Sequence, residues 1–302
     1  MAKLRFLVSL MTNDNDYQIE QAHSAEDTAR KLGIDAQVLF AENDAITQST
    51  QILRTIQVPE KDRPDAILFE PVGATALPQV ARAAVHAGVA WGVLNREASY
   101  IPEIRPTAKV PVFSVSSDQM EVGRIAGRQC AKLLPGGGAI LYIQGPSQTT
   151  VAKSREAGLH EGLPRNIHVS VLRGQWTEES AQRAVRSWLS LSTSRKAIID
   201  LVLSQNDAMA IGARKAFQEL PNEMERERWL SLPFLGCDGV PKTGQAWVRS
   251  GLLTATIYTP PSTGPAMEML VDALQNHKSL PERAFTTASS MPPLEKLFPA
   301  KP

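Results

Sequence analysis

Polar side chains recur along this sequence directly after short apolar runs that are typical of buried strands. They comprise carboxamides, carboxylates, hydroxyls and one guanidinium: Ser9, Asn13, Asn15, Asn95, Arg96, Asn206, Asp207, Asp238 and Thr259. Such a set supplies both hydrogen-bond donors and acceptors. Because each hydroxyl of a polyhydroxylated ligand donates and accepts, this inventory suits a neutral ligand of that kind. Two aromatic residues in predicted loops, Tyr17 and Trp176, could stack on the apolar face of a sugar ring.

Each of these residues also has a simpler structural explanation. Asn206 and Asp207 stand between an apolar strand and a helix in LVLSQNDAMAIGARKAF, where either could serve only as the helix cap. Arg96 could form a surface salt bridge, and Trp176 could pack in the core. What favours binding is the recurrence of the arrangement, because the carboxyl ends of parallel strands are where ligands bind in such sheets.

Sequence signatures of catalysis, phosphate binding and metal binding are missing. No glycine lies between Phe6 and Leu32, so the dinucleotide-binding fingerprint fails after the first strand. The glycines 136–138 precede a strand instead of following one, and there is neither a G-x-S-x-G elbow nor a Walker motif. His160-Glu161 lacks the second histidine of a zinc-binding helix. We therefore expect a binding protein without catalytic residues, cofactor or metal.

Composition is that of a globular protein large enough for two domains. The chain has 302 residues, 43% hydrophobic and 21% charged. Its net charge of +1 gives no electrostatic argument for nucleic acid or an anionic membrane. No apolar run reaches the roughly 18–20 residues that span a bilayer. The start, MAKLRFLVSLM, lacks a small-residue cleavage site and is interpreted as a strand, so we expect a cytoplasmic protein or one whose leader is already removed.

Apolar patterning predicts alternating strands and helices. In the first half we expect strands at 4–10, 36–40, 66–70 and 89–94 and helices at 17–32, 47–57 and 78–87. After the Pro-rich stretch IPEIRPTAKVP, FSVSSD opens a second half. There we expect helices at 119–134, 151–163, 177–191, 241–250 and 263–276 and strands at 139–143, 168–172, 198–203, 233–236 and 253–258. This alternation predicts an α/β protein with doubly wound parallel sheets.

The two cysteines leave the compartment open. Cys130 lies on the apolar face of the predicted helix 119–134, which favours a core thiol over a disulfide. Cys237 precedes Asp238 and could serve only to fill space.

The chain resembles the type I periplasmic sugar-binding proteins of the ribose-binding class, and the effector domains of lactose-repressor-like regulators. The motifs that carry this resemblance span residues 4–290: SSDQMEVGRIAG, SQNDAMAIGA, FLGCDGVPKTGQAW and SGLLTATI, together with VLNRE and AKSREAGLHEGL. The resemblance implies two doubly wound lobes joined by a three-stranded hinge, with crossings near 114–118, 256–261 and 285–290. Accordingly we expect an N-terminal lobe of 1–115 plus 259–287 and a C-terminal lobe of 116–258 plus 288–302.

The same resemblance implies which residues contact the ligand. Carried over to this sequence they are Asn15, Tyr17, Asn95, Arg96, a basic residue at Lys153 or Arg155, Trp176, Asn206, Asp238 and Thr259. Two departures stand out. The Asp-Arg pair usual in the class is Asn95-Arg96 here, and the paired aromatics of the first loop are Tyr17-Gln18.

The resemblance also implies a function. We expect a solute-binding protein that closes on a sugar or sugar derivative, acting as a monomer with an ABC transporter permease or a membrane sensor, in the periplasm or cell envelope. The alternative is the effector domain of a regulator. Such a regulator needs about 60 residues of DNA-binding domain before the first strand, and the given chain starts at that strand.

Overall fold

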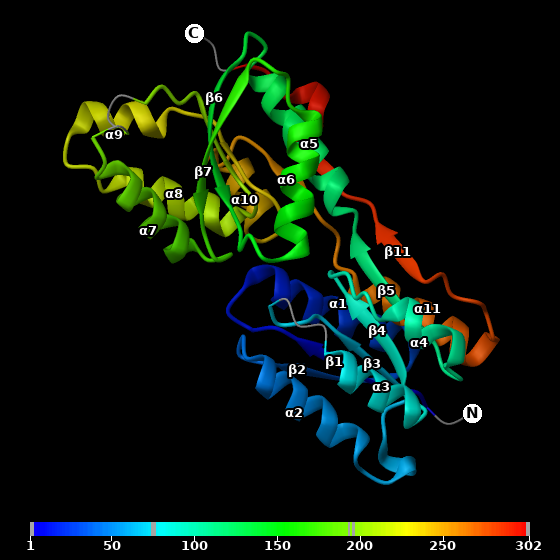
Figure 1. The fold of residues 1–302 in the computed structure, drawn as a ribbon. Helices are drawn as coiled ribbons and strands as arrows, with labels where there is room; N and C mark the ends of the chain where they lie inside the picture. Colours follow the sequence, from blue (N-terminus) through cyan, green and yellow to red (C-terminus); the bar gives the residue numbers. More distant parts are fainter. Residues whose placement is uncertain (1–2, 74–76, 193, 195–196, 300–302) are drawn as a thin grey trace. The chain divides into compact units, whose positions relative to one another are not determined.

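The computed structural model describes residues 3–73, 77–192, 194 and 197–299 (Figure 1). The chain divides into two compact units. The first comprises Met1–Ser117 and Pro261–Thr286, and the second comprises Asp118–Pro260 and Thr287–Pro302. The chain therefore passes between the units three times, after Ser117, Pro260 and Thr286.

The first unit is built on a six-stranded parallel sheet. Its strands lie in the order β11 (Arg283–Thr286), β5 (Val112–Ser117), β4 (Ala90–Leu94), β3 (Ala66–Phe69), β1 (Arg5–Leu10) and β2 (Asp35–Phe40). Side chains of β1 alternate between two cores: Phe6, Val8 and Leu10 enter one and Leu7 the other.

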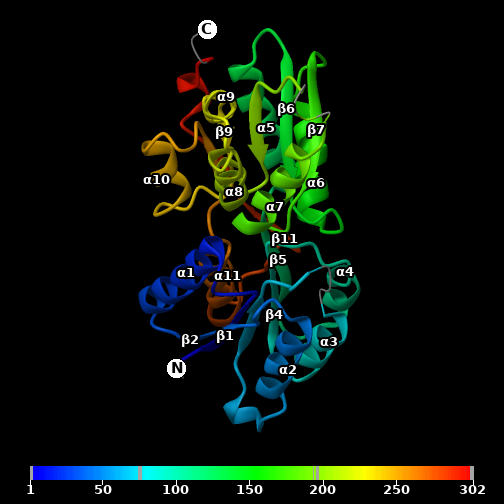
Figure 2. The ribbon, with the colours of Figure 1, turned by 90° about the vertical axis from the view of Figure 1, so that its left-hand side faces the viewer.

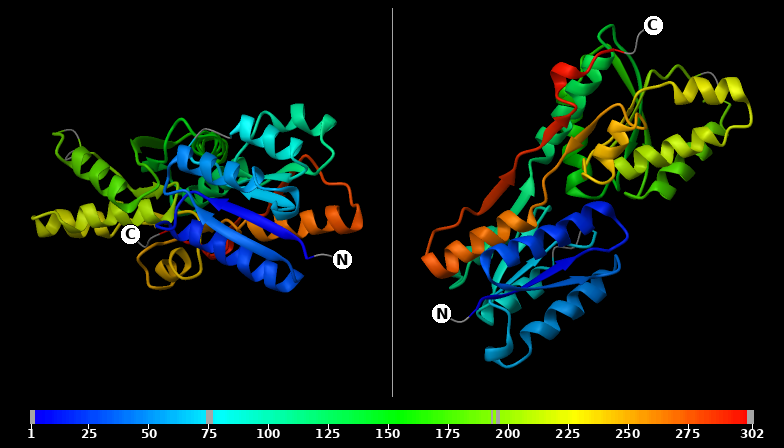
Figure 3. Two further views of the ribbon diagram at one scale, coloured as in Figure 1. Left: turned by 90° about the horizontal axis from the view of Figure 1, so that it is seen from below. Right: turned by 180° about the vertical axis from the view of Figure 1, so that it is seen from behind.

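Helices cover both faces of this sheet. On one face lie α1 (Asp16–Leu32) and α11 (Thr263–Asn276), which pack side by side (Figure 3). On the other lie α2 (Ala45–Ile56), α3 (Pro78–His86) and the short α4 (Ile101–Ile104). The 3₁₀ turns Glu60–Asp62 and Arg105–Thr107 complete the unit.

The second unit repeats this plan on four parallel strands. They lie in the order β7 (Ile167–Arg173), β6 (Gly138–Gln144), β8 (Leu201–Ser204) and β9 (Phe234–Leu235) (Figure 2). Against one face pack α5 (Gln119–Leu133) and α6 (Thr150–Gly162), and against the other α7 (Glu178–Leu189), α8 (Asp207–Gln218) and α9 (Glu223–Leu230). Both units are thus doubly wound, which confirms the predicted fold class.

Shorter elements fill the rest of the second unit. After α10 (Gly244–Arg249), β10 (Thr256–Tyr258) pairs antiparallel with β12 (Ser289–Met291), and the 3₁₀ turn Leu294–Lys296 packs near α5. Cys130 is fully buried in the core beneath α5, as predicted.

One expectation from the sequence requires correction, and three short elements lie in stretches where none was predicted. FSVSSD does not open the second unit: β5 pairs with β4 and β11 in the first sheet, and the chain crosses only after it. The Pro-rich stretch IPEIRPTAKVP contains α4, which has a proline in its first turn, where the missing N–H costs nothing. The tail after Leu280 contains β11 and β12, which are too short to show a period.

Candidate functional site

Two groups of mostly polar residues gather near the carboxyl ends of the strands, one in each unit. We call Met11, Glu70, Asn95 and Arg96 the first cluster, and Arg155, Trp176, Asn206, Asp238 and Thr259 the second cluster. Each cluster is described within its own unit.

The first cluster is organised by a buried carboxylate that the sequence analysis did not select. Glu70 directly follows β3 and is 1% exposed. Its Oε1 accepts a hydrogen bond from Asn95 Nδ2 at 3.1 Å and lies 3.6 Å from Arg96 Nη1. Arg96 Nη1 also donates to the Asn95 carbonyl at 2.9 Å. Arg96 is therefore a buried, charge-compensated residue, and the surface salt bridge is the wrong alternative.

The loop after β1 joins this cluster through Met11. Arg96 Nη2 lies 3.7 Å from the Met11 sulfur, and the Met11 N–H donates to Gln18 Oε1. Asn15 is the N-cap of α1, with its side-chain oxygen accepting from the N–H groups of Tyr17 and Gln18. Tyr17 is 7% exposed and its hydroxyl oxygen accepts from Gln21 Nε2. Both residues thus have structural roles at the start of α1.

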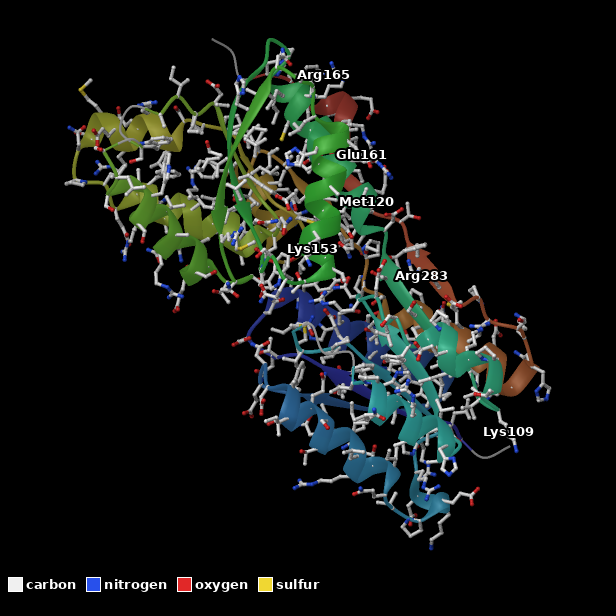
Figure 4. The ribbon with its side chains drawn as sticks, in the orientation of Figure 1. Lys109, Met120, Lys153, Glu161, Arg165 and Arg283 are labelled. Atoms are coloured by element: carbon white, nitrogen blue, oxygen red, sulfur yellow. The ribbon has the colours of Figure 1, made fainter. Side chains whose placement is uncertain are left out.

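The second cluster is centred on Arg155, which is 6% exposed on α6. Its Nε donates to Gln119 Oε1, its Nη1 donates to the Gln205 carbonyl, and its Nη2 lies 3.9 Å from Asp238 Oδ1. The guanidinium carbon lies 5.8 Å from the centre of the Trp176 ring. Of the two basic candidates, Arg155 is the one placed among the other predicted residues. Lys153 is exposed on the same helix (Figure 4).

Backbone contacts fix Asp238 and Trp176 in place. The Asp238 N–H donates to the Ile257 carbonyl, and the Thr259 N–H donates to the Asp238 carbonyl. Asn206 caps α8 by accepting from the Met209 N–H, and its Nδ2 donates to the Trp176 carbonyl. The half-buried Trp176 ring lies over Gly145 and packs at the edge of the core under α7 and α8.

Of the two residues that could cap α8, Asn206 is the N-cap and Asp207 is not. Asp207 is turned inward, where Oδ2 accepts from the Gly239 N–H and Oδ1 accepts from the Thr256 hydroxyl. Burial, with a smaller contribution from the Asp238 carboxylate, raises the pKa of Asp207 well above its ordinary value. Burial likewise raises the pKa of the neighbouring Cys237 thiol to about 12.

Three buried residues that were not predicted as site residues support these clusters: Gln48, Glu70 and Gln205. Gln205 accepts from the Gly145 N–H and donates to the Ala152 carbonyl. Gln48 fixes the chain just after β3, because its side chain donates to the Glu70 carbonyl and accepts from the Val72 N–H. A polar residue at the end of a strand was the available signal for Glu70 and Gln205, whereas Gln48 lies within α2 and gave none.

Neither a metal-binding cluster nor a membrane-spanning helix is seen in the described part of the chain. No cluster of three or more histidine, cysteine or acidic side chains could hold a metal ion there. No helix among those residues has both the length and the apolar character needed to cross a bilayer.

Two doubly wound units joined by three crossings, each with polar side chains at its strand ends, define the architecture of a two-lobed solute-binding protein. A solved solute-binding protein from Actinobacillus succinogenes with bound D-allose has this fold, with a TM-score of 0.81 over 95% of this chain and 97% of that chain at 21% identity. The Caulobacter myo-inositol binding protein also has it, with a TM-score of 0.77 over 96% of this chain and 92% of that one, again at 21% identity.

The family follows from the sequence profile of the periplasmic binding protein domain, which matches residues 6–278. The chain belongs to this family. Among curated relatives, a putative rhizopine-binding protein of Rhizobium meliloti is 27% identical over 223 residues, covering 72% of this chain and 68% of the relative. The ribose import binding protein of Salmonella typhimurium is 26% identical over 257 residues, covering 85% of this chain and 79% of the relative.

Proposed function

We propose that this protein binds a neutral polyhydroxylated small molecule, a sugar or a cyclitol, through residues of both clusters. The observation that carries this proposal is that each cluster contains one arginine and one carboxylate in contact: Arg96 with Glu70, and Arg155 with Asp238. Guanidinium groups donate to ligand hydroxyl oxygens and carboxylates accept from ligand hydroxyls. Each such charged hydrogen bond contributes about 1.5–3 kcal/mol.

Charge balance supports a neutral ligand in particular. The formal charges cancel within each pair, Arg96 with Glu70 and Arg155 with Asp238. A ligand with a net charge would place an uncompensated charge among buried groups, which is costly. Sugar phosphates and sugar acids are therefore disfavoured.

The relatives support a role in uptake or sensing. Their names describe import and binding of ribose and rhizopine, and a structural neighbour holds D-allose. In this proposal the protein works as a monomer in the cell envelope and presents its ligand to an ABC-type permease or a membrane sensor. The comparisons do not favour the alternative of a regulator's effector domain.

A thermal-shift screen tests the ligand class. We expect D-ribose, D-allose or myo-inositol to raise the melting temperature, while ribose 5-phosphate and glucuronate do not. A ligand at a hundred times its dissociation constant stabilises the fold by about 2.7 kcal/mol. If only charged compounds raise the melting temperature, the neutral-ligand proposal is wrong.

A substitution at Asp238 tests the site. Asp238→Ala removes the carboxylate facing Arg155, and we expect it to weaken binding of the sugar found in the screen by about two to three decades. The matched control is Asp62→Ala, at an exposed aspartate of the first unit, which should leave affinity unchanged. Calorimetry showing wild-type affinity for Asp238→Ala would remove this residue from the site.

A further inference from the structure

Glu70 is the least exposed charged residue of the first cluster, and its position is set by the sheet. Strand β3 lies between β1 and β4, with Phe69 opposite Ser9 on one side and opposite Val93 on the other. The Glu70 N–H donates to the Ser9 carbonyl at 2.9 Å, and Gln48 holds the Glu70 carbonyl at 2.8 Å. The carboxylate is thereby fixed beside the residues that follow β4.

The contact with Glu70 determines how Asn95 presents its side chain. An ionised carboxylate can only accept hydrogen bonds, so the amide nitrogen of Asn95 must face Glu70 Oε1, and its carbonyl oxygen must face away. The backbone of Asn95 is held in a left-handed conformation with φ 52°, and its N–H donates to the Val115 carbonyl. Asn95 therefore presents an acceptor, as an aspartate would, but a neutral one.

Glu70 also compensates the charge of Arg96. The guanidinium is 9% exposed, and the Glu70 carboxylate is the acidic group with which it forms an ion pair. Removing one partner of a buried pair leaves the other charge uncompensated, which is strongly destabilising. The residue directly before Arg96 is the neutral Asn95, so that position supplies no negative charge.

We propose that Glu70 is a positioning residue that supplies, from the neighbouring strand, the carboxylate that Asn95 lacks. It orients the Asn95 amide and compensates Arg96, so that the two residues bind ligand hydroxyls with a neutral acceptor and a charged donor. The ligand-binding part of this inference rests on the proposed function. The other part, that Glu70 compensates Arg96 in place of a carboxylate at position 95, does not rest on the proposed function, because it concerns the protein without ligand. We call this part the charge relocation.

Moving the carboxylate from position 70 to position 95 by substitution tests the inference. Glu70→Gln keeps the volume but removes the negative charge that lies 3.6 Å from Arg96 Nη1. Asn95→Asp places a second carboxylate where an amide nitrogen now lies 3.1 Å from Glu70 Oε1. The double variant Glu70→Gln/Asn95→Asp restores one carboxylate and one amide, with the direction of their hydrogen bond reversed. The matched control is Glu103→Gln, at an exposed glutamate of the same unit paired with Arg82.

The first measurement is urea unfolding of the four proteins and the control without ligand. We expect both single variants to unfold at a lower urea midpoint, the double variant to unfold closer to the wild type than either, and the control to be unchanged. Midpoint losses that simply add in the double variant would overturn the charge relocation, since contacting residues are expected to be coupled.

The second measurement is calorimetric affinity for D-ribose, D-allose and myo-inositol. For the sugar that binds, we expect each single variant to lose about tenfold or more and the double variant to recover to within about threefold of the wild type. Single variants that lose stability but bind as before would show that Glu70 acts on the fold alone, and would overturn the positioning role. If the wild type binds none of the three sugars, the proposed function fails, while the urea cycle still decides whether Glu70 serves the Asn95–Arg96 pair.

Discussion

Three predicted site residues have backbone conformations that residues other than glycine rarely adopt. The φ angles are 52° at Asn95, 65° at Trp176 and 105° at Asp238. Asparagine tolerates this region better than most residues do. For tryptophan and aspartate such a conformation typically costs about 1–3 kcal/mol and persists where surrounding contacts enforce it. Here those contacts are the hydrogen bonds to Val115, Asn206 and Ile257. Four residues outside the predicted site, Glu42, Asn43, Leu77 and His277, also have positive φ angles, so these conformations show how the three side chains are held and do not by themselves mark a binding role.

At Trp176 the ring is expected to contribute directly to affinity. A sugar presents a face of C–H groups, and stacking on an aromatic ring contributes about 1 kcal/mol. We expect Trp176→Phe to be mild and Trp176→Ala to lose about tenfold or more in affinity. Tryptophan fluorescence should shift on binding in the wild type but not in the Phe variant.

The structure makes a stability control necessary for this prediction, because Trp176 also packs over Gly145 at the edge of the core. Melting temperature and affinity should be measured on the same preparations. A lower melting temperature with unchanged affinity in Trp176→Ala would exclude the stacking role.

Asp207 is expected to make stability depend on pH. Its folded-state pKa is raised, so the unfolded chain releases this proton at a lower pH than the folded protein does. Stability should therefore fall as the pH rises from the ordinary aspartate pKa towards the raised one, because the folded state binds more protons in that window. We expect Asp207→Asn, which keeps an acceptor for Gly239 and a donor for Thr256, to flatten this slope.

The effect is measured as the urea midpoint of the wild type and of Asp207→Asn at several pH values between about pH 4 and pH 8. This range begins near the ordinary aspartate pKa and extends well above it. An exposed control, Asp27→Asn, should keep the wild-type slope. Identical slopes for wild type and Asp207→Asn would contradict the prediction.

At the scale of elements, long periodic segments were predictable, whereas some short or strongly polar elements were missed. Helix α1 begins and ends where its sequence indicates, with Asn15 as the N-cap and Gly33 in a left-handed conformation at its end. Helix α9 was missed because it is polar almost all round and buries only Trp229, although Asn222 followed by Glu225 is a capping signal. Strands β11 and β12 were missed because they have four and three residues, too few to show alternation, whereas the two-residue β9 lies within the predicted strand 233–236.

The same limit applies to the candidate site. Asn95, Arg96, Asn206 and Asp238 follow strands, so their polar character was visible in sequence. Glu70 also follows a strand, but its importance arises from pairing with β4, which is a non-local contact. The choice between Lys153 and Arg155 likewise depended on which face of α6 packs inward, and the helix is apolar on too narrow a face to decide it.

Close packing of α5 against α6 is expected to position Arg155. A Cβ at Gly158 would collide with the Met120 carbonyl of α5, and one at Gly123 would collide with the Arg155 carbonyl. Since both obstacles are backbone atoms, neither can rotate away. We expect Gly158→Ala to separate the helices, to destabilise the protein by about 1–3 kcal/mol and to displace Arg155, one turn earlier on α6.

Unfolding midpoints and sugar affinity should both decrease in Gly158→Ala. Gly136→Ala is the control, because no atom lies within 4 Å of a Cβ there. A Gly158→Ala protein as stable as the control would show that the helices adjust without cost.

At the scale of the whole molecule, three crossings between the units are the feature that makes closure mechanically simple. If the units close on a ligand, we expect the backbone torsions that change to lie at the crossings after Ser117, Pro260 and Thr286, because each unit has its own two cores. A ligand that contacts both clusters stabilises the closed arrangement by its differential affinity for it. Closure is thus a proposal additional to ligand binding, and it can fail while binding holds.

We expect the sugar identified in the screen to compact the protein without changing its secondary structure. Small-angle scattering should give a smaller radius of gyration with ligand, and circular dichroism should be unchanged. Asp238→Ala at the same ligand concentration is the control, because a variant that does not bind should keep the larger radius. If the wild type binds the sugar by calorimetry yet keeps the same radius of gyration, ligand-driven closure is wrong, and the clusters would have to bind without a change in the arrangement of the units.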